Sequence, residues 1–206
     1  MSYAVFFSGA LFNHRDLAGN ELLAKALAVV SQDRYRPVLP QRWFADGELC
    51  TRTRNKDIRG ELEADIVLFN FDGTELDSGT VVEYMIAKML DMPAVALRTD
   101  VRRSGDCSGL NWNLMVSGYP RTRVIEPQSS VWYRDYGLDE MYRRLASVLA
   151  ESLDSVMQEK GCLHSRQEVR NAYLNVVRAL GAGFAEELTE AEIEKLVDQK
   201  MSRGLY

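Results

Sequence analysis

The sequence is poor in the residues that bind transition metals and form disulfides, with two histidines and three cysteines in 206 residues. Zinc sites are built mainly from clusters of these residue types, so we expect no metal site. Cys50, Cys107 and Cys162 are widely separated and form no Cys-x-x-Cys pair, which indicates reduced thiols in a cytosolic protein. The core must therefore come from apolar side chains, and 46% hydrophobic residues are enough for one.

Long apolar runs and an excess of basic residues are also missing. No stretch reaches the ~20 apolar residues that a membrane-spanning helix needs. Residues 1–9 lack the basic start of a signal peptide. The formal net charge of -5 disfavours a surface that binds nucleic acid. We therefore predict a cytoplasmic protein that binds neither membranes nor nucleic-acid polymers.

Apolar runs and helical patterns alternate along the first part of the chain. The predicted strands are residues 3–8, 35–39, 65–71, 93–98 and 122–126. The predicted helices between them are residues 16–31, 53–64 and 79–91. This alternation is typical of βαβ units. The predicted fold is α/β, a flavodoxin-like, doubly wound parallel sheet of five strands in the order 2-1-3-4-5.

From residue 138 the pattern changes, because helical segments follow one another without a strand between them. The predicted helices are residues 138–160, 165–180 and 189–201. We therefore divide the chain into an α/β domain at 1–137 and an α-helical C-terminal extension at 138–206. The extension is expected to cover the sheet domain or to mediate oligomer contacts.

Phosphate-binding glycine motifs are missing where this fold would carry them. The loop after the first strand is SGALFNHRD, without G-x-G-x-x-G, and the chain has no G-x-x-x-x-G-K-[ST]. A dinucleotide or ATP site is therefore disfavoured. A phosphate-accepting signalling module would end its fifth strand in lysine, whereas this strand ends in Ile125-Glu126. The candidates that remain near the strand ends are carboxylates: Asp57, Asp72, Glu75, Asp77 and Glu83.

Asp77 and Glu83 stand at the start of a predicted helix. Residues 77–80 (DSGT) can form a tight turn whose free backbone N–H groups favour an anion. Both acids also have a structural explanation, Asp77 as an N-cap worth ~1 kcal/mol and Glu83 as a first-turn acid worth ~0.3–1 kcal/mol. Glu83 nevertheless lies among apolar residues, a poor place for a solvated charge. A positioned, partly buried carboxylate is a good nucleophile toward a sugar carbon.

These residues resemble the nucleoside 2-deoxyribosyltransferase family. Its members carry a turn like residues 8–12 (SGALF) after the first strand and an aspartate like Asp57 before the third. Their signature D-x-G-T-x-x-E is matched by residues 77–83, and a later N-L-M is matched by residues 113–115. The resemblance covers residues 3–126 and leaves the C-terminal helices unexplained.

The resemblance implies a role for each matched side chain. Glu83 would be the nucleophile that attacks C1′ of a deoxyribonucleoside, and Asp57 would carry the proton to and from the nucleobase. Asp77 would bind the sugar hydroxyls. Asn113 would reach the 5′ end of the sugar in a neighbouring subunit's site, with Met115 nearby. A shared site of this kind implies a homo-oligomer.

The end of the first strand is expected to hold the nucleophile in place. Phe6 stands where some family members have a tyrosine that bonds the nucleophile, and a phenylalanine cannot make that bond. Ser8 or Tyr84 is therefore left to orient the carboxylate of Glu83. Ser8 and Gly9 belong to the turn that the family uses next to its substrate.

Three further segments complete the predicted binding set. The turn at Gly79 is expected to bring backbone close to the ligand. Gln41 follows the second strand and could bond the nucleobase. Other side chains that could line the same pocket are Trp43, Phe44, Asn111 and Trp112.

The predicted activity is transfer of 2-deoxyribose between nucleobases by a retaining double displacement, through a covalent glycosyl-Glu83 intermediate. The substrates would be a deoxyribonucleoside and a free nucleobase, and the chemistry needs no cofactor. One alternative is a nucleoside or nucleotide N-glycosidase, in which water resolves the same intermediate. A more distant alternative is a non-catalytic ligand-binding or signalling domain.

Charge bears on whether the substrate carries a phosphate. An ionised Asp77 beside a 5′-phosphate is electrostatically unfavourable, so we expect nucleosides rather than nucleotides. Arg98, Arg102 and Arg103 could hold a phosphate, but Asp100 and Asp106 lie among them, which favours a solvated loop.

Overall fold

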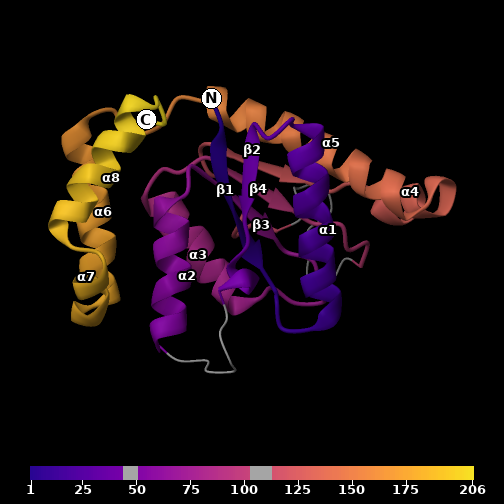
Figure 1. Cartoon of the computed structure of the whole chain (residues 1–206), viewed down its shortest axis with the longest axis horizontal. Helices are drawn as coiled ribbons and strands as arrows, with labels where there is room; N and C mark the ends of the chain where they lie inside the picture. The colour runs from indigo at the N-terminus through magenta and orange to yellow at the C-terminus, as the bar shows by residue number, and fades with distance from the viewer. Residues whose placement is uncertain (44–50, 103–112) are drawn as a thin grey trace.

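The computed structural model describes residues 1–43, 51–102 and 113–206. Its centre is one parallel sheet of five strands in the order β2-β1-β3-β4-β5 (Figure 1). The strands are β1 (Tyr3–Gly9), β2 (Tyr35–Val38), β3 (Ile66–Asn70), β4 (Ala94–Leu97) and β5 (Thr122–Ile125). The predicted fold class and strand order are confirmed.

Helices cover both faces of this sheet. Their bounds are α1 (His14–Val30), α2 (Thr51–Glu63), α3 (Ser78–Met89) and α5 (Leu138–Gln158). Val5 and Phe7 of β1 are buried against α1 and α5, whereas Phe6 is buried on the opposite face with α2 and α3. Successive strand residues point to opposite faces, so a strand covered on both sides must be apolar throughout. The strands therefore appear in the sequence as continuous apolar runs.

The C-terminal part is helical, as predicted, and it lies on two sides of the molecule. Its remaining helices are α4 (Ser129–Tyr136), α6 (Arg166–Leu180), α7 (Ala182–Glu187) and α8 (Glu190–Ser202). α5 lies with α1, whereas α6, α7 and α8 stand beside α2 (Figure 1). Tyr173 of α6 donates a hydrogen bond to the carbonyl of Leu62 (3.3 Å), and Arg203 pairs with Asp65 (2.6 Å). The division of the chain at residue 137 stays a prediction.

The loops after β3 and β4 are tied to each other. Nη1 of Arg98 donates to the carbonyls of Phe71 (2.8 Å) and Gly73 (3.2 Å). In return, the carboxylate of Asp72 accepts hydrogen bonds from the backbone N–H groups of Thr99 (2.5 Å) and Asp100 (2.9 Å). These bonds hold the loop that leads into α3. After β2 the chain continues into a short 3-10 helix (Pro40–Arg42).

Within the described residues, no helix is long and apolar enough to cross a bilayer. In the same ranges, no three His, Cys, Asp or Glu side chains come together as metal ligands would.

Candidate active site

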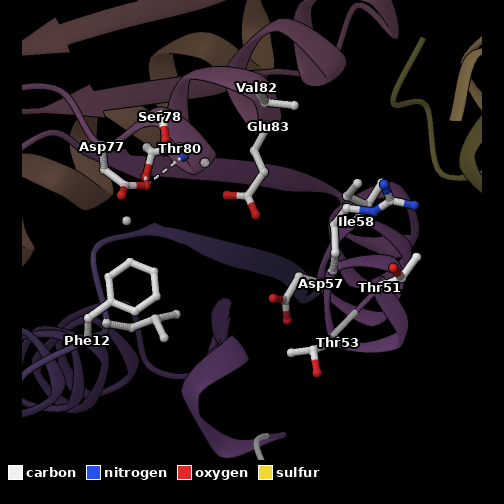
Figure 2. A pocket seen from close by; sticks show the side chains of 14 residues that line it. Phe12, Thr51, Thr53, Asp57, Ile58, Asp77, Ser78, Thr80, Val82 and Glu83 are labelled. Atoms are coloured by element: carbon white, nitrogen blue, oxygen red, sulfur yellow. Dashed lines mark hydrogen bonds between the residues drawn. The ribbon is translucent and has the colours of Figure 1, made fainter. Parts of the chain in front are cut away.

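A cavity of about 760 Å³ opens where the β1–α1 loop, the first half of α2 and the start of α3 meet. Figure 2 shows three carboxylates that point into it, those of Asp57, Asp77 and Glu83. Ligands of doubly wound sheets bind at the carboxyl ends of the strands, and this cavity includes Gly9 at the end of β1. The cavity is therefore the candidate active site.

Asp77 begins α3 and faces the cavity. Its Oδ2 atom accepts hydrogen bonds from the backbone N–H of Thr80 (2.8 Å) and from the Thr80 hydroxyl (2.8 Å). A Cβ atom at Gly79 would lie 3.2 Å from this oxygen, so glycine gives the carboxylate room. The capping role expected from the sequence is thus present, and both capping bonds fall on a single oxygen of Asp77.

Glu83 projects from α3 toward the other two carboxylates. The hydroxyl of Ser8, at the end of β1, donates a hydrogen bond to its Oε2 atom. The pKa of Glu83 is raised to about 7, mainly by burial; the Ser8 hydrogen bond opposes this rise, and the charges of Asp57 and Asp77 add to it. Glu83 therefore changes its charge near neutral pH and is oriented by a neighbouring strand.

Asp57 stands on α2, across the cavity from Glu83 (Figure 2). Burial raises its pKa to about 6, and the ammonium group of Lys56 opposes this. An acid that holds its proton close to neutral pH can protonate a leaving group and later take the proton back. The cavity thus holds two carboxyl groups that titrate near neutral pH, and such a pair can supply both a carboxylate for attack and an acid for proton transfer.

Comparison with known proteins decides the family. Residues 5–115 match the model of a family described as nucleoside 2-deoxyribosyltransferase. That span is more than half of the 206 residues. The chain belongs to the nucleoside 2-deoxyribosyltransferase family. No curated protein matches it.

Solved structures resemble the chain at low identity. A conserved protein from Enterococcus faecalis V583 is 22% identical with a TM-score of 0.52, and the match covers 70% of this chain and 99% of that one. The 2-desoxiribosyltransferase from Leishmania mexicana is 21% identical with a TM-score of 0.48, over 66% of this chain and 99% of its own. The 2-deoxyribosyltransferase from Bacillus psychrosaccharolyticus is 17% identical with a TM-score of 0.45, over 65% and 93%. The first likeness shows a shared fold.

The cavity brings together five of the residues that the family resemblance singled out. They are Gly9, Asp57, Asp77, Gly79 and Glu83. Gly9 is a close-approach position, because a Cβ atom there would lie 3.0 Å from Cβ of Asn70 in β3. Ser8 acts on the cavity through Glu83, whereas Tyr84 donates its hydroxyl to the carbonyl of Val116 (2.7 Å). Ser8, and not Tyr84, is thus the hydrogen-bond partner of Glu83.

Phe6 and Gln41 lie outside the cavity lining. Phe6 is fully buried against Trp43, with ring centroids 6.1 Å apart. Gln41 donates to the carbonyl of Leu17 (3.0 Å) and accepts from Asn20 (3.3 Å), which ties it to α1. Contact of Gln41 with the nucleobase stays a prediction, as does the place of Phe6 in the substrate-binding set. Phe44, Asn111 and Trp112 lie outside the described residues.

Asn113 and Met115 also do not line the cavity of their own chain. The side-chain oxygen of Asn113 accepts a hydrogen bond from the backbone N–H of Met115 (2.8 Å). Met115 is 73% exposed, so its side chain is free to meet another surface. Their role in a neighbouring subunit's site stays a prediction.

Two residues of α2 escaped the sequence analysis. Arg54 lines the cavity three residues before Asp57, and helical spacing places the two side chains on one side of α2. Glu61, four residues after Asp57, is fully buried, and neither of its carboxyl oxygens has a partner within the described residues. Burial, followed by the charge of Glu83, raises the pKa of Glu61 well above its ordinary value. In the sequence, the feature that could have singled out both residues is their helical spacing from Asp57, three residues before it and four after it.

Proposed function

We propose that this protein transfers 2-deoxyribose from a deoxyribonucleoside to a free nucleobase by a retaining double displacement. The observation that carries the proposal is that Glu83 and Asp57 face one cavity, each with a pKa close to neutral. Membership of the nucleoside 2-deoxyribosyltransferase family supports the substrate class.

The first displacement forms an ester between the sugar and Glu83. An oxygen of Glu83 bonds to C1′ while the C1′–nitrogen bond breaks and its electron pair stays with the base. The base leaves with the proton of Asp57, because an unprotonated base is a poor leaving group. Ser8 holds the attacking carboxylate toward the cavity through its hydrogen bond.

The second displacement reverses the first with a different base. A nitrogen of the incoming base bonds to C1′, and the ester oxygen of Glu83 leaves as a carboxylate. Asp57 takes the proton that this nitrogen gives up. Two inversions at one carbon restore the starting configuration, so the product keeps the stereochemistry of the substrate.

Asp77 is proposed to bind the sugar hydroxyls and to disfavour a 5′-phosphate. The arginines that could have held a phosphate are engaged elsewhere. Arg98 is buried and donates to backbone carbonyls, and Arg102 pairs with Asp100. Arg103 lies outside the described residues. We therefore expect faster turnover of deoxyribonucleosides than of their 5′-monophosphates, and the reverse order would contradict this assignment.

A homo-oligomer is proposed to complete the site. One side of α3 carries exposed apolar residues at helical spacing: Val82, Met85 and Met89. Leu114 and Met115 are exposed as well, and Val82 also lines the cavity. Covering these side chains with a second copy would remove apolar surface from water and bring Asn113 of one copy to the cavity of another.

The exchange reaction tests the proposal directly. Incubation with deoxyinosine and adenine is expected to give deoxyadenosine and hypoxanthine. Glu83→Gln should abolish the exchange, whereas Glu75→Gln, at an exposed loop carboxylate, should leave it unchanged. Free deoxyribose without deoxyadenosine would instead select the N-glycosidase. If wild type forms neither product, both the transferase and the N-glycosidase assignments fail.

A further inference from the structure

Arg54 is the one basic side chain among the described residues that line the cavity. The other charged groups there are the carboxylates of Asp57, Asp77 and Glu83. Arg54 and Asp57 are three residues apart on α2, which places them side by side along the helix. The cation therefore stands next to the group that handles the nucleobase, on the same wall of the cavity.

Two successive side-chain contacts, through Asn55 and Glu187, hold Arg54 in place. Nε and Nη2 of Arg54 both donate to Oδ1 of Asn55, at 3.1 Å and 2.7 Å. The amide of Asn55 is buried, and its Nδ2 atom donates to Oε1 of Glu187 at 3.1 Å. Glu187 is the last residue of α7, so the C-terminal helices reach the cavity wall through two hydrogen-bonded steps.

Glu187 is itself anchored to α2 by its backbone. Arg59 donates to the carbonyl of Glu187, and its Nη2 atom also pairs with Glu192 at the start of α8 (3.1 Å). Glu187 therefore contacts α2 at two places, its carboxylate at Asn55 and its carbonyl at Arg59. The family match ends at residue 115, so α7 and Glu187 lie outside it, whereas Asn55 and Arg59 lie within it.

The chemistry of arginine limits what Arg54 can bind. A guanidinium group only donates hydrogen bonds, and its charge is permanent. An oxo group of a nucleobase accepts such bonds, and a ring nitrogen beside it lets the arginine make two, as in arginine contacts to guanine. An exocyclic amino group at the same place would present its own N–H donors to the guanidinium, which is unfavourable.

We propose that Arg54 is a specificity-determining residue that contacts the oxo group of a 6-oxopurine base, positioned by the C-terminal helices through Glu187 and Asn55. The proposal rests on the proposed function, because it places the nucleobase beside Asp57. It assigns to the C-terminal helices a part in choosing the substrate. It also makes Glu187 a positioning residue that does not touch the substrate.

Deoxyinosine carries an oxo group where deoxyadenosine carries an amino group, so we would compare the kcat/KM values of the two nucleosides. Wild type should favour deoxyinosine. Arg54→Met, which keeps the length of the side chain, should lower kcat/KM for deoxyinosine by about tenfold to a hundredfold, and far less for deoxyadenosine. Arg52→Met, on an exposed residue of the same helix that does not line the cavity, is the matched control.

The positioning part has its own variants. Glu187→Ala should raise KM for deoxyinosine several-fold with little change in kcat, because Arg54 loses its orientation and the reacting groups do not. Glu187→Gln keeps an acceptor oxygen for Asn55 and should restore wild-type KM. Glu186→Ala, at the exposed neighbour on α7, should change neither. A merely structural role would instead lower the unfolding temperature and affect both nucleosides equally.

The outcomes separate this proposal from the proposed function. The role of Arg54 would be overturned if Arg54→Met lost the same factor in kcat/KM for both nucleosides, or if wild type did not favour deoxyinosine. Either result would leave the proposed transfer reaction intact. If wild type turns over neither nucleoside, the proposed function fails. Calorimetric binding of deoxyinosine and deoxyadenosine to wild type and Arg54→Met then decides the role of Arg54 by the same comparison.

Discussion

The hydroxyl of Ser8 donates a hydrogen bond to the carboxylate of Glu83, across 75 residues of sequence. The bond connects the carboxyl end of β1 with α3, and it orients the proposed nucleophile toward the cavity. Phe6, two residues earlier on β1, faces the same side of the sheet but has no hydroxyl and packs in the core. Ser8 therefore supplies the hydrogen bond to Glu83 that a phenylalanine cannot make.

Removing the Ser8 hydroxyl should shift the pH dependence of the reaction. Glu83 must be ionised and Asp57 protonated, and because the pKa of Glu83 (about 7) lies above that of Asp57 (about 6), kcat/KM falls below about pH 6 and above about pH 7. The Ser8 bond lowers the pKa of Glu83, and in Ser8→Ala the alkaline limb, which is set by Glu83, should therefore move to higher pH. The loss of a bond to a charged group should also reduce kcat by about tenfold or more.

Ser152→Ala removes a hydroxyl that bonds within α5, and it serves as the control for Ser8→Ala. The measurement is the pH profile of kcat/KM for both variants and wild type. An alkaline limb that stays in place in Ser8→Ala would show that Ser8 does not act on the charge of Glu83.

Asp57→Asn should remove the proton donor for the leaving base. Asp57 must hold its proton to act, but its pKa of about 6 lies below that of Glu83, so the active form, with Asp57 protonated and Glu83 ionised, is a minority form at every pH. The variant should lose about a hundredfold to ten-thousandfold in kcat/KM for natural nucleosides. The fall in kcat/KM at alkaline pH should disappear, and a single rise should remain at the pKa of Glu83, which lies below about 7 in the variant because the charge of Asp57 no longer raises it.

A substrate whose leaving group needs no proton gives the internal control for Asp57. With a 4-nitrophenyl deoxyriboside, formation of the Glu83 ester should be affected far less in Asp57→Asn than with deoxyinosine. Equal losses on both substrates would mean that Asp57 does not protonate the leaving base.

Glu61→Met should stabilise the protein at neutral and alkaline pH. The pKa of Glu61 in the folded chain lies well above its ordinary value of 4.5, so the folded state binds the proton more tightly. Its contribution to stability is therefore fullest below about pH 4.5 and is lost as the pH rises toward the folded pKa. An apolar side chain avoids both this loss and the unpaired carboxyl oxygens, which predicts a gain of about 1–3 kcal/mol.

Urea unfolding at about pH 5 and about pH 8 measures this difference in the free energy of unfolding. The advantage of Glu61→Met should grow with pH, while Glu151→Met, at an exposed position of α5, should show no such trend. A variant that is less stable than wild type at both pH values would mean that Glu61 has a partner that the structure does not show.

Met89→Lys should weaken the proposed oligomer. Met89 is 55% exposed on the apolar side of α3, and a lysine there would have to lose water when a second copy covers it. Sedimentation should show a shift toward monomer, and activity at low protein concentration should fall. Val29→Lys, at a 77% exposed residue of α1, is the control. A fully active wild-type monomer would remove Asn113 from the site.

Local patterns account for the parts of the fold that the sequence predicts correctly. The strands are apolar runs, and the start of α3 follows from Asp77, which caps the helix with its side chain. α4 and α7 are missing from the predicted set. α4 buries none of its residues, and α7 has six residues after Gly181, so neither produces a clear apolar period. Periodicity detects a helix only where one side of it is buried.

The sequence by itself determined the α/β fold, the strand order and the identity of Asp57, Asp77 and Glu83 as candidates, because these depend on local spacing and on a family signature. Only the tertiary structure decided which side chains act on them. The Ser8–Glu83 bond and the Asn55–Glu187 bond join positions 75 and 132 residues apart. The burial of Glu61 likewise depends on how the helices pack around it. Contacts of this range are set by the packing of whole helices against the sheet, and no local pattern records them.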